Sequence, residues 1–345
     1  MHNGKKVIDV HGHMSTPPQF RAYAYNLIAL RSPGEGELEI SDELMETALG
    51  RHLKMMDERS IDIQMISPRP VAMMHWEAAF IVEGWTRTTN NIIHQQCKMH
   101  PDRFVGIAQL PQSSTLNTKN CVEELERCVK EMGFVGAIVN PDPAGDRQTP
   151  GMNTEYWFPL YEKAQALQAP LIVHPSISRD PRIEIIPHSY QYNNLTEEAL
   201  ATLLLENGNV FELFPNLKII ICHCGGALSR FVTRGKRTGE GGGQVGVAVR
   251  RRERAARDVS QNLFFDTCAY DKDFLATAIK QRGVDRMVFG TEAPGTGTSV
   301  INPDTGKPSD DLVPLVDSIE FLTAEDKKKI FYDNPKRVFP LLKVQ

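Results

Sequence analysis

Two histidines near the start of the chain have the spacing of a metal-binding pair. His11 and His13 end the apolar run Val-Ile-Asp-Val-His-Gly-His, which has the composition of a buried strand. In a strand, residues i and i+2 point to the same face, so both imidazoles can reach one ion. Neutral imidazole is a common ligand of Zn²⁺ and similar ions, and Gly12 adds no side chain to crowd the opposite face. Taken alone the pair is a weak signal, because surface histidines also produce it.

Three more polar residues end other apolar runs. His174 follows Leu-Ile-Val, His223 follows Ile-Ile-Cys, and Glu292 follows Phe-Gly-Thr. A core histidine is the ordinary interpretation of each histidine singly, but five such positions at equivalent strand ends together favour a metal site. Three imidazoles and a carboxylate would hold one divalent ion, either Zn²⁺ or Mn²⁺, and leave a position for water of lowered pKa. Glu292 can bind that metal or act as general base, and His223 fits an acid/base role or a polariser of substrate oxygen.

The elements around these residues predict the α/β class, specifically a (β/α)8 TIM barrel, because β-rich apolar segments alternate eight times with helical stretches. The expected strands are Val7–His13, Ile63–Pro68, Phe104–Pro111, Phe134–Pro141, Pro170–Pro175, Lys218–Gly225, Leu263–Ala269 and Met287–Pro294. The rival is a doubly wound open sheet, which the absence of Gly-x-Gly-x-x-Gly and Walker-A runs disfavours. A barrel gathers all its strand ends at one catalytic face. No second domain boundary is visible, so residues 1–345 are expected to form one domain.

Two helices have recognisable ends in the sequence. Thr118 is the expected N-cap of a helix that closes near Gly133. The run Asn194-Leu195-Thr196-Glu197 has capping-box spacing and predicts a helix over 198–206, with Gly208 as its stop.

The cysteines do not indicate a disulfide framework or a zinc knuckle in a chain of this length. They are Cys97, Cys121, Cys128, Cys222, Cys224 and Cys268. We interpret all six as structural. Cys222 and Cys224 flank His223 in an expected strand and should therefore face away from it.

Composition and charge exclude several classes of protein. The chain has 345 residues, 41% of them hydrophobic, and a net charge of -4, which gives no indication of nucleic-acid binding. The basic run Arg250–Arg254 is interpreted as a solvated helix face, because acidic residues alternate with it. No apolar run is long enough to span a bilayer, and no signal peptide precedes the first expected strand. We expect a cytoplasmic protein without membrane or nucleic-acid partners, and a homo-oligomer, since barrels of this kind often associate.

The set of one H-x-H pair, two further strand-end histidines and a strand-eight acid resembles the amidohydrolase superfamily. Within it the chain is similar, over essentially its full length, to the branch containing aminocarboxymuconate-semialdehyde decarboxylase. The resemblance implies that His11, His13, His174 and Glu292 are metal ligands and that His223 is a catalytic neighbour. Bimetallic members usually carry a bridging lysine near the end of strand four, where this chain has Asn140, so one metal is expected.

The strand-eight acid separates this chain from the typical decarboxylases of the branch, which have Gly-Thr-Asp where it has Gly-Thr-Glu. The glutamate and segments such as Ile-Ser-Pro-Arg-Pro and Asn-Pro-Asp-Pro-Ala-Gly resemble the 4-oxalomesaconate hydratases. This implies a metal-dependent lyase that hydrates an unsaturated keto-dicarboxylate from aromatic ring cleavage. A C–C bond hydrolase of a meta-cleavage product and a non-oxidative decarboxylase remain alternatives. A non-enzymatic binding module is disfavoured by the intact set of ligands and acid/base residues.

Small polycarboxylate substrates of this group require cationic and hydroxyl anchors. Arg69, just after the second expected strand, is the best candidate for a carboxylate clamp, with a surface ion pair as the alternative. Tyr192 and Asn194 match the Tyr-x-Asn of the hydratases, which implies a hydrogen bond to substrate oxygen. Asp266 in the seventh expected strand is expected to support the barrel interior.

Overall fold

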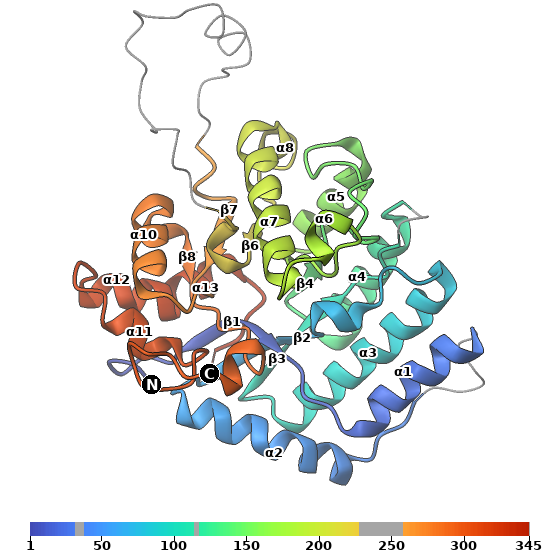
Figure 1. Ribbon diagram of the computed structural model, residues 1–345, viewed down its shortest axis with the longest axis horizontal. Coiled ribbons are helices and arrows are strands. Elements are labelled where there is room, and N and C mark those ends of the chain that lie inside the picture. The colour runs from blue at the N-terminus through green and yellow to red at the C-terminus, as the bar shows by residue number, and fades with distance from the viewer. Residues whose placement is uncertain (32–37, 114–116, 228–257, 345) are drawn as a thin grey trace, which may run out of the picture.

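Eight parallel strands form one sheet in the order β1 to β8, surrounded by helices (Figure 1). The structure, a computed structural model, describes residues 1–31, 38–113, 117–227 and 258–344. The strands are β1 (Ile8–His13), β2 (Ile63–Ser67), β3 (Phe104–Gln109), β4 (Gly136–Val139), β5 (Leu171–Val173), β6 (Ile219–Ile221), β7 (Leu263–Asp266) and β8 (Met287–Val288). Hydrogen bonds from Val10 N to Phe289 O and from His13 N to Ala293 O join the first strand to the segment directly after β8. The predicted (β/α)8 barrel is confirmed.

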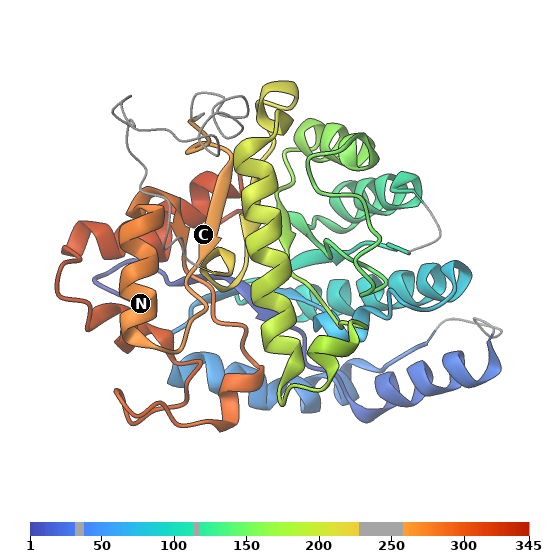
Figure 2. The same ribbon diagram turned by 45° about the horizontal axis from the view of Figure 1, so that its top comes forward.

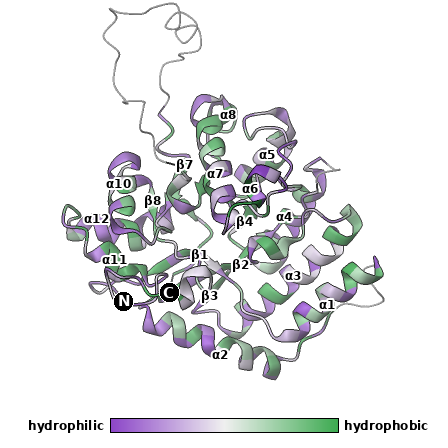
Figure 3. Ribbon diagram, in the orientation of Figure 1, coloured by the Kyte–Doolittle hydropathy of each residue, from purple (hydrophilic) through white to green (hydrophobic). Residues whose placement is uncertain are grey.

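The helices lie outside the strands, and Figure 2 shows α7, in yellow-green, at the front of the barrel. They are α1 (Pro18–Leu30), α2 (Asp42–Glu58), α3 (Ala79–Met99), α4 (Lys119–Met132), α5 (Phe158–Ala166), α6 (Pro181–Glu184), α7 (Ser189–Asn207), α8 (Val210–Leu213), α10 (Lys272–Arg282), α11 (Leu312–Asp317), α12 (Ala324–Lys328) and α13 (Asn334–Val338). Most of them mix hydrophobic and hydrophilic residues, while the strands are largely hydrophobic (Figure 3). This colouring is expected when one face of a helix covers a sheet and the other meets water.

Each strand contributes to two apolar layers, because successive side chains alternate between the faces of the sheet. An outer layer, with Leu171 and Ile219, packs against helix residues such as Trp85. The inner layer fills the barrel with Ile8, Val10, Met65, Ile107, Ile138, Ile172, Ile220, Phe264 and Val288. Residues two positions after an inner residue also point inward, at the carboxyl end of the barrel. By this rule the side chains of Ser67, His174, Cys222 and Asp266 all point into the carboxyl end of the barrel.

Strand β1 breaks this alternation with a β-bulge. Its register against β2 shifts by one residue between Asp9 and Gly12, so Val10 and His11 together face a single residue of β2. Such a bulge re-aims the side chains that follow it. Val10 points into the barrel, and His11 does so as well, while Asp9 remains on the outer face with Gln64. Gly12 also points outward, where a Cβ would lie 2.3 Å from Gln64 Cδ, so only glycine fits.

The two helix-end predictions have different outcomes. Helix α4 begins directly after Thr118 and ends at Gly133, which adopts φ 71°, at the predicted positions. The Thr118 hydroxyl does not cap the helix, however, and donates instead to the Tyr156 carbonyl at 3.1 Å. The predicted start at Asn194 is wrong, since α7 begins at Ser189 and continues to Asn207, with Gly208 at its end. Instead of capping a new helix, the Thr196 hydroxyl donates to the carbonyl of Tyr192 one turn earlier.

Two other expectations concern the surface and the thiols. Within the described ranges, no helix is both long and apolar enough to cross a bilayer. All six cysteines are free thiols, in agreement with the prediction. The basic run Arg250–Arg254 lies outside the described residues.

Candidate metal centre and active site

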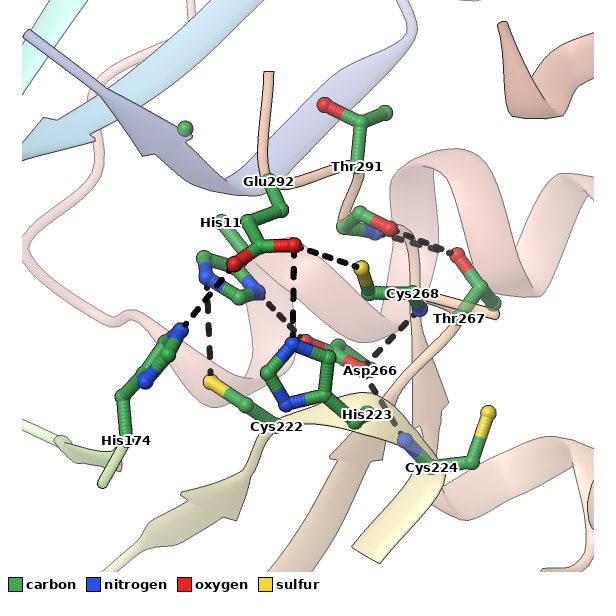
Figure 4. Close-up of polar contacts among 12 residues, drawn as sticks. His11, His174, Cys222, His223, Cys224, Asp266, Thr267, Cys268, Thr291 and Glu292 are labelled. Atoms are coloured by element: carbon green, nitrogen blue, oxygen red, sulfur yellow. Dashed lines mark hydrogen bonds and ion pairs between the residues drawn. The ribbon is translucent and has the colours of Figure 1, made fainter. Parts of the chain in front are cut away.

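Three histidines converge at the carboxyl end of the barrel. One ligand nitrogen from each of His11, His13 and His174 lies within 4.8 Å of the other two. The side chains are almost completely buried, and the ring centroids of His11 and His174 are 5.0 Å apart (Figure 4). This spacing allows three imidazoles to bind a single ion.

The outward nitrogen of each ring is already engaged, which fixes the orientation of all three rings. The Nδ1 partners are Asp266 Oδ2 at 2.7 Å for His11, Ser67 Oγ at 3.3 Å for His13 and the Pro175 carbonyl at 2.7 Å for His174. The Nε2 atoms of His13 and His174 are buried and have no hydrogen-bond partner in the described part of the chain. Metal-binding histidines characteristically donate one nitrogen to a carboxylate, carbonyl or water and offer the other to the ion. The buried nitrogens therefore fit a divalent metal.

The protonation state of the rings is also that of metal ligands. Burial lowers the pKa of His174 to about 4 and holds the pKa of His13 well below its ordinary value. Both rings are therefore neutral near pH 7, with a lone pair free for an ion. Burial alone would raise the pKa of Asp266, but the hydrogen bond to His11 lowers it, so a charged carboxylate stands behind the His11 ring.

Glu292 lies in the loop after β8, beside His174 and His223, and these three side chains form a second group with metal-ligand spacing that shares His174 with the first. Its Oε1 lies 3.6 Å from His174 Nε2, and its Oε2 lies 3.6 Å from His223 Nε2. The Tyr270 hydroxyl donates to Oε2 at 3.3 Å. Burial alone would raise the pKa of Glu292, yet the contacts with His174 and His223 lower it well below its usual value. The carboxylate is therefore ionised, as a metal ligand or a general base requires.

His223 reaches the site through a turn that the sequence did not predict. Strand β6 ends at Ile221, and His223 begins a short 3₁₀ segment (His223–Gly225) with a left-handed backbone, φ 47°. Its Nδ1 contacts Glu198 Oε1 of α7 at 2.7 Å. Burial alone would lower the pKa of His223, but the charge of Glu198 outweighs it and raises that pKa well above its ordinary value. Burial raises the pKa of Glu198 to about 7. His223 and Glu198 therefore hold a proton between them.

The prediction that Cys222 faces away from His223 is wrong. Cys222 continues the alternation of β6 and points into the barrel with its Sγ 4.0 Å from His11 Nε2, while the backbone turn at His223 brings that ring to the same site. Cys268 likewise lies at the site, with its Sγ 4.0 Å from Glu292 Oε2 (Figure 4). Two thiols therefore border the candidate metal centre.

The predicted substrate residues lie at different places. Arg69 is exposed at the end of β2, where its Nη2 donates to the Pro294 carbonyl at 2.6 Å, two residues after Glu292. No carboxylate among the described residues forms an ion pair with it, so its other N–H groups remain available to a substrate. Asn194 is buried on α7, one turn before Glu198 and on the same helix face. Tyr192 is 50% exposed, and its position on α7 is on a different face from Glu198.

Sequence reasoning missed two residues that touch the predicted catalytic groups. Tyr270 follows β7 by four residues, and its contact with Glu292 depends on the path of the intervening turn. Glu198 lies four residues after Asn194, and this helical spacing was the available signal for a second side chain facing the barrel.

Comparison with known proteins places these residues in a family. Residues 8–341 match the amidohydrolase family. The chain belongs to this family. It is 32% identical over 347 residues to a 2-keto-4-carboxy-3-hexenedioate hydratase of Sphingobium sp., covering 97% of this chain and 96% of the relative. It is 28% identical over 259 residues to a gamma-resorcylate decarboxylase of Polaromonas sp., covering 71% and 76% of the two chains.

Solved structures of amidohydrolases agree with the fold. The 4-oxalomesaconate hydratase from Rhodopseudomonas palustris superposes with a TM-score of 0.79 at 30% identity, covering 97% of this chain and 96% of that one. A dihydroxybenzoic acid decarboxylase from Polaromonas sp., solved with bound manganese, gives a TM-score of 0.68 at 21% identity and covers 99% and 98%. The predicted family, enzyme class and branch are confirmed, with relatives that are hydratases and decarboxylases.

Proposed function

We propose that this amidohydrolase is a metal-dependent hydro-lyase that adds water to the C=C bond of an unsaturated keto-polycarboxylate. The observation that carries the proposal is the ionised Glu292 carboxylate, 3.6 Å from both His174 and His223. The hydratase relatives, which match this chain over nearly its whole length, support the same reaction class.

The metal in this proposal is a single divalent ion held by His11, His13, His174 and Glu292. When bound, such an ion lowers the pKa of a coordinated water and polarises a carbonyl oxygen. Zn²⁺ is the ion we propose first, and Mn²⁺ second, because histidine and carboxylate ligands suit both.

The reacting groups of the chain supply a base and an acid on the same side of the barrel. In conjugate addition, water oxygen bonds to the alkene carbon β to the ketone, and the π electrons move onto the ketone as an enolate. Glu292 takes the proton that the water loses, since its carboxylate is ionised. His223 holds a proton at Nε2, supported by Glu198 at Nδ1, and is suited to stabilise the enolate or return a proton to its α-carbon. One water is thereby added with no net gain or loss of protons.

Substrate carboxylates require a cationic anchor beside these groups. Arg69 at the rim provides a planar guanidinium for this purpose. Asn194 and Tyr192 are the proposed hydrogen-bonding partners of substrate oxygens. The fit is better for the buried Asn194, since Tyr192 can reach a substrate only by reorientation of its exposed side chain.

We also propose that the protein is a homo-oligomer that acts in the cytoplasm. Support for association comes from exposed leucines along α7, among them Leu200 at 49% and Leu203 at 58% exposure. Light scattering of the purified protein measures the oligomeric state.

The reaction is tested with the metal-loaded enzyme and 2-keto-4-carboxy-3-hexenedioate in ¹⁸O-labelled water. We expect loss of the conjugated absorbance and one product, heavier by one labelled water. Glu292→Gln is expected to abolish turnover and keep the circular dichroism of the parent, because the amide cannot accept the proton. Two product fragments would instead indicate a C–C hydrolase, and release of carbon dioxide a decarboxylase. Tight binding without turnover of any ring-cleavage acid would indicate a binding module.

A further inference from the structure

A buried carboxylate outside the proposed reaction centre joins β1 to the segment after β8. Asp9 is fully buried on the outer face of β1. Its Oδ1 accepts hydrogen bonds from the backbone N–H of His11 at 3.0 Å and of Thr291 at 3.1 Å. Its Oδ2 accepts from the Thr291 hydroxyl at 2.6 Å and from Gln64 Nε2 at 2.7 Å. Both carboxylate oxygens of this buried side chain are therefore fully hydrogen-bonded, by four donors in total.

Gln64 extends the same network to the other side of Glu292. Its Nε2 also donates to the Ala293 carbonyl at 3.1 Å. Its Oε1 therefore accepts from His52 Nε2 of α2 at 2.5 Å, which anchors the amide to an outer helix. Thr291 and Ala293, the residues immediately before and after Glu292, are thus both hydrogen-bonded to this network. Thr291 is bonded to Asp9, and Ala293 is bonded to Gln64.

Glu292 needs such support because its backbone is strained. It adopts φ 63°, in the left-handed region that costs a residue with a Cβ about 1–2 kcal/mol. Conformations of this kind persist where the surrounding structure over-determines them. The Glu292 N–H also donates to the His11 carbonyl at 2.6 Å, so the same turn is attached to a proposed metal ligand.

We propose that Asp9 and Gln64 are a positioning pair that holds the Glu292 carboxylate in register with His11. The pair is bonded to none of the four proposed metal-binding side chains, and it acts through the backbone at His11, Thr291 and Ala293 and through the Thr291 hydroxyl. This inference rests on the metal site of the proposed function, but it does not depend on which substrate the enzyme takes.

The test replaces one member of the network by an isostere. Thr291→Val removes the hydroxyl that donates to Asp9 and accepts from Ala293 N, while Thr291→Ser keeps it. Thr86→Val is the matched control, because Thr86 on α3 is equally buried and its hydroxyl accepts from Gln109 Nε2, which is not bonded to a candidate ligand. Asp9→Asn is a second variant, which turns an amide N–H toward the N–H of Gln64.

The decisive measurement is the rate of metal loss to a chelator, made without substrate. We expect Thr291→Val and Asp9→Asn to lose metal about 10- to 100-fold faster, as is typical when an outer partner of a ligand is removed. Where the hydratase assay is positive, kcat should fall by a similar factor with little change in KM. Thr291→Ser should restore both values, and Thr86→Val should leave both unchanged despite a comparable loss of thermal stability.

Two outcomes separate this inference from the proposed function. Equal metal retention in Thr291→Val, Thr86→Val and the parent would overturn the positioning role. A parent enzyme that holds metal but hydrates none of the test acids would overturn the proposed reaction and leave the metal-retention test valid. If Thr291→Val fails to fold, the comparison of Asp9→Asn with Thr86→Val decides the question.

Discussion

The Asp266→Asn variant should weaken metal binding through the tautomer of His11. Asp266 Oδ1 accepts from the backbone N–H groups of Cys224 at 3.2 Å and Cys268 at 3.0 Å. In the variant these two donors keep the amide oxygen at that position, so the NH₂ group faces His11 Nδ1. His11 must then accept at Nδ1 and carry its proton on Nε2, the nitrogen intended for the ion. A lone pair on His11 Nε2 returns only if the ring keeps its proton on Nδ1, facing the NH₂ group, or if the new amide rotates away from its two backbone donors.

The expected loss is about 10- to 100-fold in metal affinity, the usual effect of removing a partner behind a ligating histidine. This corresponds to about 1.4–2.7 kcal/mol of binding free energy. Competition with a chromogenic chelator measures it, and the metal-dependent part of thermal stability should fall in parallel. Asp142→Asn is the control, since the Asp142 side chain is bonded to Arg147 N and the Thr149 hydroxyl rather than to a candidate ligand. Unchanged metal affinity in Asp266→Asn would refute the tautomer argument.

Two further predictions concern pH and substrate binding. Burial lowers the pKa of His52 to about 4, whereas the unfolded chain has a histidine pKa of about 6.5, so the unfolded state binds more protons as the pH falls below 6.5. The stability contributed by neutral His52 is therefore about 2 kcal/mol smaller at pH 5 than at pH 7, and urea unfolding of His52→Gln should show a correspondingly weaker pH dependence. Arg69→Gln should raise KM by about 10- to 150-fold, the range of one charge-assisted hydrogen bond, with unchanged metal content; an unaltered KM would exclude the proposed clamp.

The side chains at the strand ends could be predicted from the sequence because their direction depends only on the alternation within each strand. His174 and Asp266 follow short apolar strands by whole multiples of the two-residue period, so their inward direction follows from alternation alone. The same rule placed His11 and His13 on one face correctly. Alternation alone would also have placed Asp9 on that face. The β-bulge, which leaves Asp9 on the outer face, depends on the register of β1 with β2 and could not be predicted from β1 alone.

Other features depended on contacts between distant segments. His223 faces the site because its backbone turns left-handed after β6, and nothing in the tripeptide Cys-His-Cys requires that turn. Glu198 and Tyr270 became visible only once α7 and the loop after β7 were placed against the barrel. The capping-box prediction at Asn194 failed because α7 already begins at Ser189, more than one turn before Asn194.

The hydrogen bonds that join β1 to the segment after β8 have a consequence for the order in which this protein matures. The His11 carbonyl accepts from Glu292 N, so two proposed ligands 281 positions apart in the sequence are brought together where β1 meets the segment after β8. Contacts of such sequence separation form late, after the intervening chain has been ordered. A nascent chain on the ribosome lacks Glu292 and its turn until all eight strands have been synthesised. Binding of the proposed ion is therefore expected only once the barrel is complete, and a truncated product would carry the histidines without Glu292.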